Sequence, residues 1–198
     1  MKTIYLTRHG ETEFNKRKLI QGSGVDSSLN ETGLAQAEAF FEKHYDVKFD
    51  KVYTSALKRT HQSMSGFIAN GVPWEQHAGL NEISWGNKEG RAATPEENDE
   101  YYSTLQLWRE GQTHVTMRGG ESPEQVVARQ KPVIDLILSR PEERTILICM
   151  HGRAIRILLC HLLGYDLRYQ DMFEHRNLCL YKLHYTGTMF TVELANYI

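Results

Sequence analysis

The stretch Ile4-Tyr5-Leu6-Thr7-Arg8-His9-Gly10 decides the fold, because an apolar segment typical of a buried strand ends in three residues suited to phosphate. The guanidinium of Arg8 is a planar fork of donors that matches phosphate oxygens. A neutral His9 has a nitrogen that can attack phosphorus, and Gly10 lets the backbone approach a ligand closely. The stretch predicts a phosphate site at a strand end. The alternative is a strand end that carries two polar residues by chance.

A second apolar run, at residues 145–150, ends in the same way at His151-Gly152, and a helical pattern follows over 153–163. Ligands of open α/β sheets bind beyond the carboxyl ends of the strands. We therefore expect the imidazoles of His9 and His151 to meet at one edge of a parallel sheet. The alternative is that each histidine only caps its own strand.

The rest of the chain alternates between strand and helix patterns. The expected strands are 2–7, 50–55, 74–77, 145–150, 178–184 and 189–194, and the expected helices are 31–44, 56–70, 122–139 and 153–163. A turn at Thr186-Gly187 predicts that one terminal strand is antiparallel. The pattern indicates one α/β domain over residues 1–198, in three α/β/α layers around a mostly parallel, mixed sheet. A lid-like excursion with an amphipathic helix is expected over 91–120.

The composition is that of an ordinary globular protein. The chain has 198 residues, 40% of them hydrophobic, and a net charge of -2, which lacks the basic excess expected of nucleic-acid binding. Its three cysteines, Cys149, Cys160 and Cys179, are typical of reduced thiols, and no metal-binding spacing is visible. No apolar run approaches membrane-spanning length, and because the first predicted strand begins at residue 2 we expect no signal peptide. We expect a cytoplasmic protein without nucleic-acid or membrane partners. Its oligomeric state is open, a homodimer included.

The segment Arg8-His9-Gly10-Glu11-Thr12 with Asn15, together with His151-Gly152, resembles the histidine phosphatase superfamily, also called phosphoglycerate mutase-like. Other segments resemble the family in its order along nearly the whole chain: Gln21-Gly22 with Asp26 and Leu29, residues 55–60, residues 80–83 with Gly86 and Glu89-Gly90, and residues 119–122. The resemblance implies the family's fold and its phosphoryl transfer without a metal or other cofactor.

The resemblance also implies roles for individual residues. His9 would be the nucleophile that forms a phosphohistidine, with one ring nitrogen held as a donor by a backbone carbonyl. Glu82 would protonate the departing alcohol and then activate water. Arg8, Arg59 and His151 would surround the phosphate, Arg59 from the first turn of its helix, where a bound anion offsets an unfavourable dipole. The expected substrate-binding residues are Asn15, Gln21, Gly22, Gly152 and Asn177.

Three functions stay open. A metal-independent phosphatase acting on a small phosphorylated metabolite is favoured, because the stretch 83–91 resembles the phosphatase branch and lacks the arginine-rich insertion of the mutases. Lys88 and Phe14 depart from that branch, each standing where it has tryptophan. The first alternative is a cofactor-dependent phosphoglycerate mutase. The second is a non-catalytic phosphate-binding or interaction module, which would need neither the nucleophile His9 nor the acid Glu82.

Overall fold

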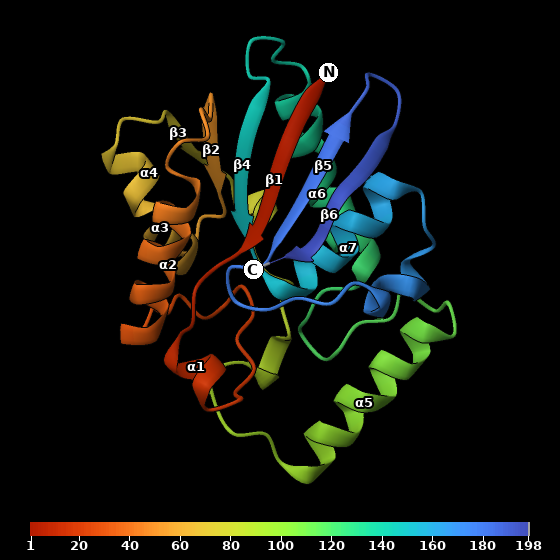
Figure 1. Cartoon of the computed structure of the whole chain (residues 1–198). Coiled ribbons are helices and arrows are strands. Elements are labelled where there is room, and N and C mark those ends of the chain that lie inside the picture. The colour runs from red at the N-terminus through yellow and green to blue at the C-terminus, as the bar shows by residue number, and fades with distance from the viewer. Residues whose placement is uncertain (198) are drawn as a thin grey trace.

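A twisted mixed sheet forms the centre of the molecule (Figure 1). The computed structural model describes residues 1–197, and Ile198, the last residue of the predicted domain, lies outside the described residues. Over residues 1–197 the sheet has six strands in the order β3-β2-β4-β1-β5-β6. The strands are β1 Lys2–Arg8, β2 Lys51–Thr54, β3 Trp74–Gln76, β4 Thr145–Met150, β5 Leu180–Tyr185 and β6 Phe190–Tyr197.

The strand directions confirm the predicted mixed sheet. β1 and β2 both pair in parallel with β4, and β3 pairs in parallel with β2. β5 is antiparallel to both β1 and β6, so within residues 1–197 it alone runs against the others. In the register of β1 with β4, Arg8 lies opposite Met150. The residues that follow each strand, His9 and His151, therefore leave the sheet side by side.

Helices cover both faces of the sheet, which confirms the three layers. They are α1 Glu13–Lys16, α2 Glu31–His44, α3 Lys58–Ser63, α4 Ser65–Ala69, α5 Pro95–Arg109, α6 Pro123–Leu138 and α7 Gly152–Leu163, with 3-10 turns η1 Ala78–Leu80, η2 Gly86–Lys88 and η3 Leu167–Met172. Figure 1 shows α2, α3 and α4 on one side of the sheet and α6 and α7 on the other. Alternate side chains of β4 point to opposite faces of the sheet. Leu147 packs in the cluster under α2, whereas Ile146 packs in the cluster under α6 and α7.

Capping residues fix where the long helices begin. The Asn30 side chain accepts a hydrogen bond from the backbone of Gly33 at 2.8 Å, so α2 spans the predicted residues 31–44. Ser122 and Gln125 form a capping box at the start of α6. None of the helices within residues 1–197 is long and apolar enough to cross a membrane.

The prediction of one continuous helix over 56–70 is wrong. The helix starts at Lys58, and Met64, at φ -103° and ψ 5°, separates α3 from α4. The hydroxyl of Ser63 explains the break, because it donates to the carbonyl of Arg59 at 2.6 Å and accepts from the backbone N–H of Gly10 at 2.9 Å. The interruption thus attaches this helix to the loop after β1.

The predicted excursion over 91–120 contains one amphipathic helix, as expected. This helix, α5, extends away from the sheet in Figure 1. Its buried side chains Leu105 and Trp108 pack with Trp85 in a cluster separate from those on the two sheet faces. The role of the excursion as a lid stays a prediction.

Candidate active site

The two histidines predicted to meet do so. The ring centroids of His9 and His151 lie 5.2 Å apart, although the residues are far apart in sequence. The backbone N–H of His9 donates to the carbonyl of Met150 at 3.1 Å, which ties the end of β1 to the end of β4. Both side chains are buried, with exposed fractions of 2% and 0%. The parallel register of the two strands is what brings them together.

The hydrogen bonding of His9 defines its tautomer. Its Nδ1 lies 2.7 Å from the carbonyl oxygen of Gly10, and a carbonyl only accepts, so Nδ1 carries the proton. This leaves a lone pair on Nε2, which is hydrogen-bonded to no group within residues 1–197. Burial, followed by the charges of Arg59 and Arg8, holds the pKa of His9 well below its usual value. His9 is therefore a neutral imidazole with Nε2 available, the form that a nucleophile needs.

Arg8 is held by a residue that the sequence analysis missed. Its Nη1 donates to Nδ1 of His175 at 3.2 Å, and its buried Nε finds no acceptor among the described residues. Burial and the nearby arginines, Arg8 first among them, lower the pKa of His175 to about 3, so that His175 stays neutral and can accept. No local pattern marked His175, which lies between η3 and β5, the strand paired with β1.

The side chain of Arg59 is fully buried. It donates from Nη1 to the carbonyl of Val25 at 2.6 Å, from Nη2 to that of Gly22 at 3.2 Å, and from Nε to Nδ1 of His151 at 3.2 Å. Burial lowers its pKa to about 10, opposed by the charge of Glu82, so the guanidinium stays charged at neutral pH. Arg59 thus joins the loop around Gly22 to His151.

The contact with Arg59 also sets the state of His151. Because its Nδ1 accepts, its Nε2 carries the proton, which it donates to the hydroxyl of Ser55 at 2.8 Å. Burial, followed by the charge of Arg59, keeps the pKa of His151 well below its usual value. His151 is thus a neutral donor beside His9.

Glu82 lies at the start of α7 and caps it. Its Oε1 accepts from the backbone N–H groups of Ile83 and Ala154, both at 2.9 Å, and its Oε2 accepts from that of Arg153 at 3.1 Å. The carboxylate therefore sits on the positive end of the helix dipole. Since α7 begins directly after His151, this cap places the Glu82 carboxylate at the same helix start as His151.

A clamp formed by Arg129 and Glu121 supports the acid segment. Arg129 donates to the carbonyls of Gly79, Asn81 and Glu82 at 2.8, 2.9 and 3.0 Å. It also donates to both carboxylate oxygens of Glu121, at 2.8 and 3.0 Å. Burial opposes ionisation of Glu121, but Arg129 outweighs it and lowers the pKa of this carboxyl. The clamp gives a physical reason for the Gly-Gly-Glu-Ser segment at 119–122, which the sequence analysis matched without a role.

The predicted substrate-binding residues divide into two groups. Asn177 donates to the carbonyl of His9 at 2.9 Å and to Oδ1 of Asn15 at 3.3 Å, so this pair lies beside His9. Gln21 has its amide engaged within its own loop, donating to the hydroxyl of Thr12 at 2.8 Å and accepting from that of Ser27 at 2.7 Å. Gln21 therefore shapes the loop around the site.

The two predicted glycines are required by close packing. A Cβ on Gly22 would lie 2.5 Å from the carbonyl of Ile83, and a Cβ on Gly152 would lie 2.6 Å from the ring of His175. Gly152 thus lets α7 start directly against the residue that holds Arg8. No group of three or more histidine, cysteine or acidic residues within 1–197 could hold a metal ion.

Comparison with known proteins adds to this geometry. The family model of the histidine phosphatase superfamily (branch 1) matches residues 4–198. Mouse 6-phosphofructo-2-kinase/fructose-2,6-bisphosphatase 1 is 39% identical over 165 residues, which cover 82% of this chain but only 33% of that relative, so the chain spans about a third of its length. The probable phosphoglycerate mutase GpmB of Erwinia tasmaniensis is 31% identical over 183 residues, covering 89% of this chain and 82% of the relative. The solved structure of Bacillus stearothermophilus YhfR superposes with a TM-score of 0.86 at 26% identity, covering 100% of this chain and 98% of that one.

Proposed function

Because the chain belongs to the histidine phosphatase superfamily (branch 1), we propose that it is a phosphatase that hydrolyses small phosphate monoesters through a phosphohistidine at His9. One observation carries the proposal: the hydrogen bond from Nδ1 of His9 to the carbonyl of Gly10, which leaves the Nε2 lone pair free. The guanidinium groups of Arg8 and Arg59 supply the positive charge that a transferring phosphoryl group requires.

The reaction has two steps. In the first, Nε2 of His9 forms a bond to phosphorus while the ester P–O bond breaks, and Glu82 gives its proton to the departing oxygen. This step needs the carboxyl of Glu82 in its protonated form. In the second, the Glu82 carboxylate takes a proton from water, the water oxygen bonds to phosphorus and the P–N bond breaks. Inorganic phosphate leaves, and His9 and Glu82 return to their starting states.

The proposed substrate is a small phosphorylated metabolite, with neither nucleic acid nor membrane as partner. Fructose 2,6-bisphosphate is the first compound to test, because the relatives that are 39% identical include a fructose-2,6-bisphosphatase. We place the reaction in the cytoplasm, since Cys149, Cys160 and Cys179 are buried free thiols, as expected of a reducing compartment.

Phosphoglycerate mutase activity is a second candidate, favoured by the similarity to GpmB over 89% of the chain. A mutase passes the phosphoryl group from His9 to a second substrate, whereas a phosphatase passes it to water. Incubation with 3-phosphoglycerate, with and without its 2,3-bisphosphate, separates the two. Release of inorganic phosphate supports the phosphatase, and formation of 2-phosphoglycerate supports the mutase.

The test of the proposed intermediate is direct trapping. Enzyme mixed with ³²P-labelled fructose 2,6-bisphosphate or 3-phosphoglycerate and quenched in alkali is expected to carry base-stable, acid-labile label on the peptide containing His9. His9→Ala is expected to lose both the label and turnover. His114→Ala, at an exposed histidine of the excursion, is the matched control and is expected to keep both. Near wild-type turnover in His9→Ala would show that the proposal is wrong.

A further inference from the structure

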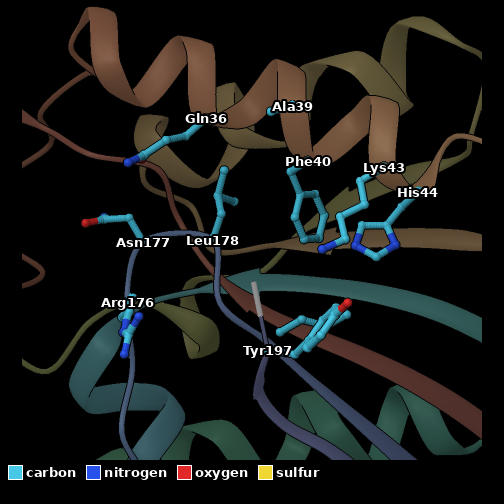
Figure 2. A pocket seen from close by; sticks show the side chains of 10 residues that line it. Gln36, Ala39, Phe40, Lys43, His44, Arg176, Asn177, Leu178 and Tyr197 are labelled. Atoms are coloured by element: carbon cyan, nitrogen blue, oxygen red, sulfur yellow. The ribbon is translucent and has the colours of Figure 1, made fainter.

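A cavity of about 530 Å³ lies between α2 and the end of the sheet that carries β5 and β6 (Figure 2). Its volume falls within the range of roughly 300–1,000 Å³ usual for small-molecule sites. Phe40 from α2 and Leu178 and Leu180 from the other wall give it an apolar interior. The proposed reaction uses none of these three side chains.

The polar residues that line this cavity are unbalanced in charge. Lys43 and Arg176 contribute two cations, and no aspartate or glutamate lines the cavity. Neither cation forms an ion pair within residues 1–197, and Nζ of Lys43 lies 4.3 Å from the centroid of the Tyr197 ring. In Figure 2, Lys43 and Arg176 lie on opposite sides of Phe40 and Leu178. The lining is complementary to an anion that has an apolar body.

One wall of the cavity is directly bonded to the residues around the proposed nucleophile. Asn177, which lines the cavity, donates to the carbonyl of His9 at 2.9 Å. The backbone N–H of Leu178 donates to the carbonyl of Arg8 at 3.0 Å. Leu178 has φ +53°, a left-handed conformation that costs free energy for a leucine and is held only by its surroundings. A ligand packed on Leu178 would therefore act on a strained segment bonded to both Arg8 and His9.

We propose that this cavity binds an organic anion with an apolar body, of the alkyl or aryl carboxylate class, and that its occupancy changes the affinity of the His9 site for phosphate. The body packs on Phe40 and Leu178, and the anionic head pairs with Lys43. A ligand that prefers one arrangement of the segment 177–178 shifts its equilibrium, and the coupling between the two sites is reciprocal. This binding site goes beyond the proposed hydrolysis.

Binding is tested by calorimetric titration of the full chain with 1-naphthoate. The uncharged 1-naphthamide and acetate, an anion without an apolar body, are each expected to bind at least about tenfold more weakly than 1-naphthoate. Loss of a charged hydrogen bond or of apolar burial produces a factor of this size. Lys43→Ala is expected to weaken naphthoate binding about tenfold, and Ala39→Trp, which fills the cavity from α2, is expected to abolish it. Lys48→Ala and Ala128→Trp, at exposed positions outside the cavity lining, are the matched controls and are expected to bind as the wild type does.

Coupling is tested by titrating inorganic phosphate with and without saturating 1-naphthoate. The phosphate dissociation constant is expected to change by about fivefold or more in the wild type and to stay constant in Ala39→Trp. Equal naphthoate binding by wild type and Ala39→Trp, or equal binding of naphthoate and naphthamide, would overturn the site. An unchanged phosphate affinity would overturn the coupling. Should Ala39→Trp fail to fold, Lys43→Ala decides the binding. Absence of phosphate binding in every sample would refute the proposed function, whereas the naphthoate titration stands independently of it.

Discussion

Replacement of Glu82 by glutamine separates its structural role from its chemical one. The substitution retains an oxygen that can accept from Ile83 and Ala154, but it places an NH₂ donor opposite the backbone N–H of Arg153. One hydrogen bond to a charged group is lost, and the largely buried N–H of Arg153 is left unpaired, which together cost about 2–3 kcal/mol. Loss of the negative charge at the start of α7 adds about 0.5–1 kcal/mol. We expect the free energy of unfolding to fall by about 2.5–4 kcal/mol.

The chemical role is measured by leaving-group dependence. A general acid matters most when the departing oxygen is strongly basic, so Glu82→Gln is expected to reduce hydrolysis of glycerol phosphate far more than that of p-nitrophenyl phosphate. Pre-steady-state bursts identify the limiting step, because Glu82 is also proposed to activate water. Both sets of rates are compared well below the midpoint of urea unfolding, where the variant is fully folded.

Glu89→Gln is the matched control for Glu82→Gln. The Glu89 carboxylate also accepts from two backbone N–H groups, those of Trp85 at 2.7 Å and Gly24 at 2.8 Å. It has no proposed chemical role, so its substitution is expected to lower stability without any leaving-group dependence. If Glu82→Gln loses less than about 1 kcal/mol of stability, the capping argument fails. If both substrates slow equally without a burst, Glu82 is not the acid.

Three further predictions concern the charges of the site and their support. His9, His151 and His175 have pKa values below the ordinary 6.5, so the unfolded state binds more protons as the pH falls below 6.5. The free energy of unfolding is thus expected to fall on acidification by up to about 1.4 kcal/mol per pH unit for each histidine. His175→Gln should reduce this slope in urea titrations between pH 6.5 and 4. An unchanged slope would contradict the role of His175. Arg8→Gln is expected to weaken inhibition by inorganic phosphate at least about tenfold with a small change in Tm. Arg59→Gln leaves three acceptors without a donor, so it should also lower Tm by several degrees. Equal losses of Tm in the two variants would contradict this difference. Glu121→Gln is expected to lower kcat more than it raises KM, because the clamp holds the acid segment and not the phosphate, and steady-state kinetics would disprove this if only KM changed.

The sequence predicted the features that depend on local pattern. The apolar runs before His9 and His151 became adjacent parallel strands, and the caps at Asn30 and Ser122 located the starts of α2 and α6. The meeting of the two histidines followed from one topological rule, because residues after neighbouring parallel strands share an edge of the sheet. These inferences need only short windows of sequence.

The features that the sequence did not predict depend on contacts between distant segments. His175 accepts a hydrogen bond from the guanidinium of Arg8, which lies 167 residues away in the sequence. No local pattern marks such a pair. The break at Met64 has the same origin, since Ser63 bonds to Gly10, 53 residues away. A helix propensity scale does not include a hydrogen bond between a serine hydroxyl and a backbone N–H far away in the sequence.

The two arginines of the proposed phosphate site differ in how many of their donors the protein already uses. All three nitrogens of Arg59 donate to acceptors of the protein, so its charge is fixed in place before any anion arrives. Arg8 is held at one nitrogen, by a histidine that stays neutral, and its Nε has no acceptor within residues 1–197. A phosphate oxygen can therefore bond to Nε of Arg8 without breaking a hydrogen bond within the protein. A phosphate oxygen near Arg59 meets a charge whose position is already fixed. Burial of the two charged guanidinium groups lowers the stability of the fold. The hydrogen bonds by which Glu82 caps α7 and Arg129 holds Glu121 stabilise the segment that carries Glu82.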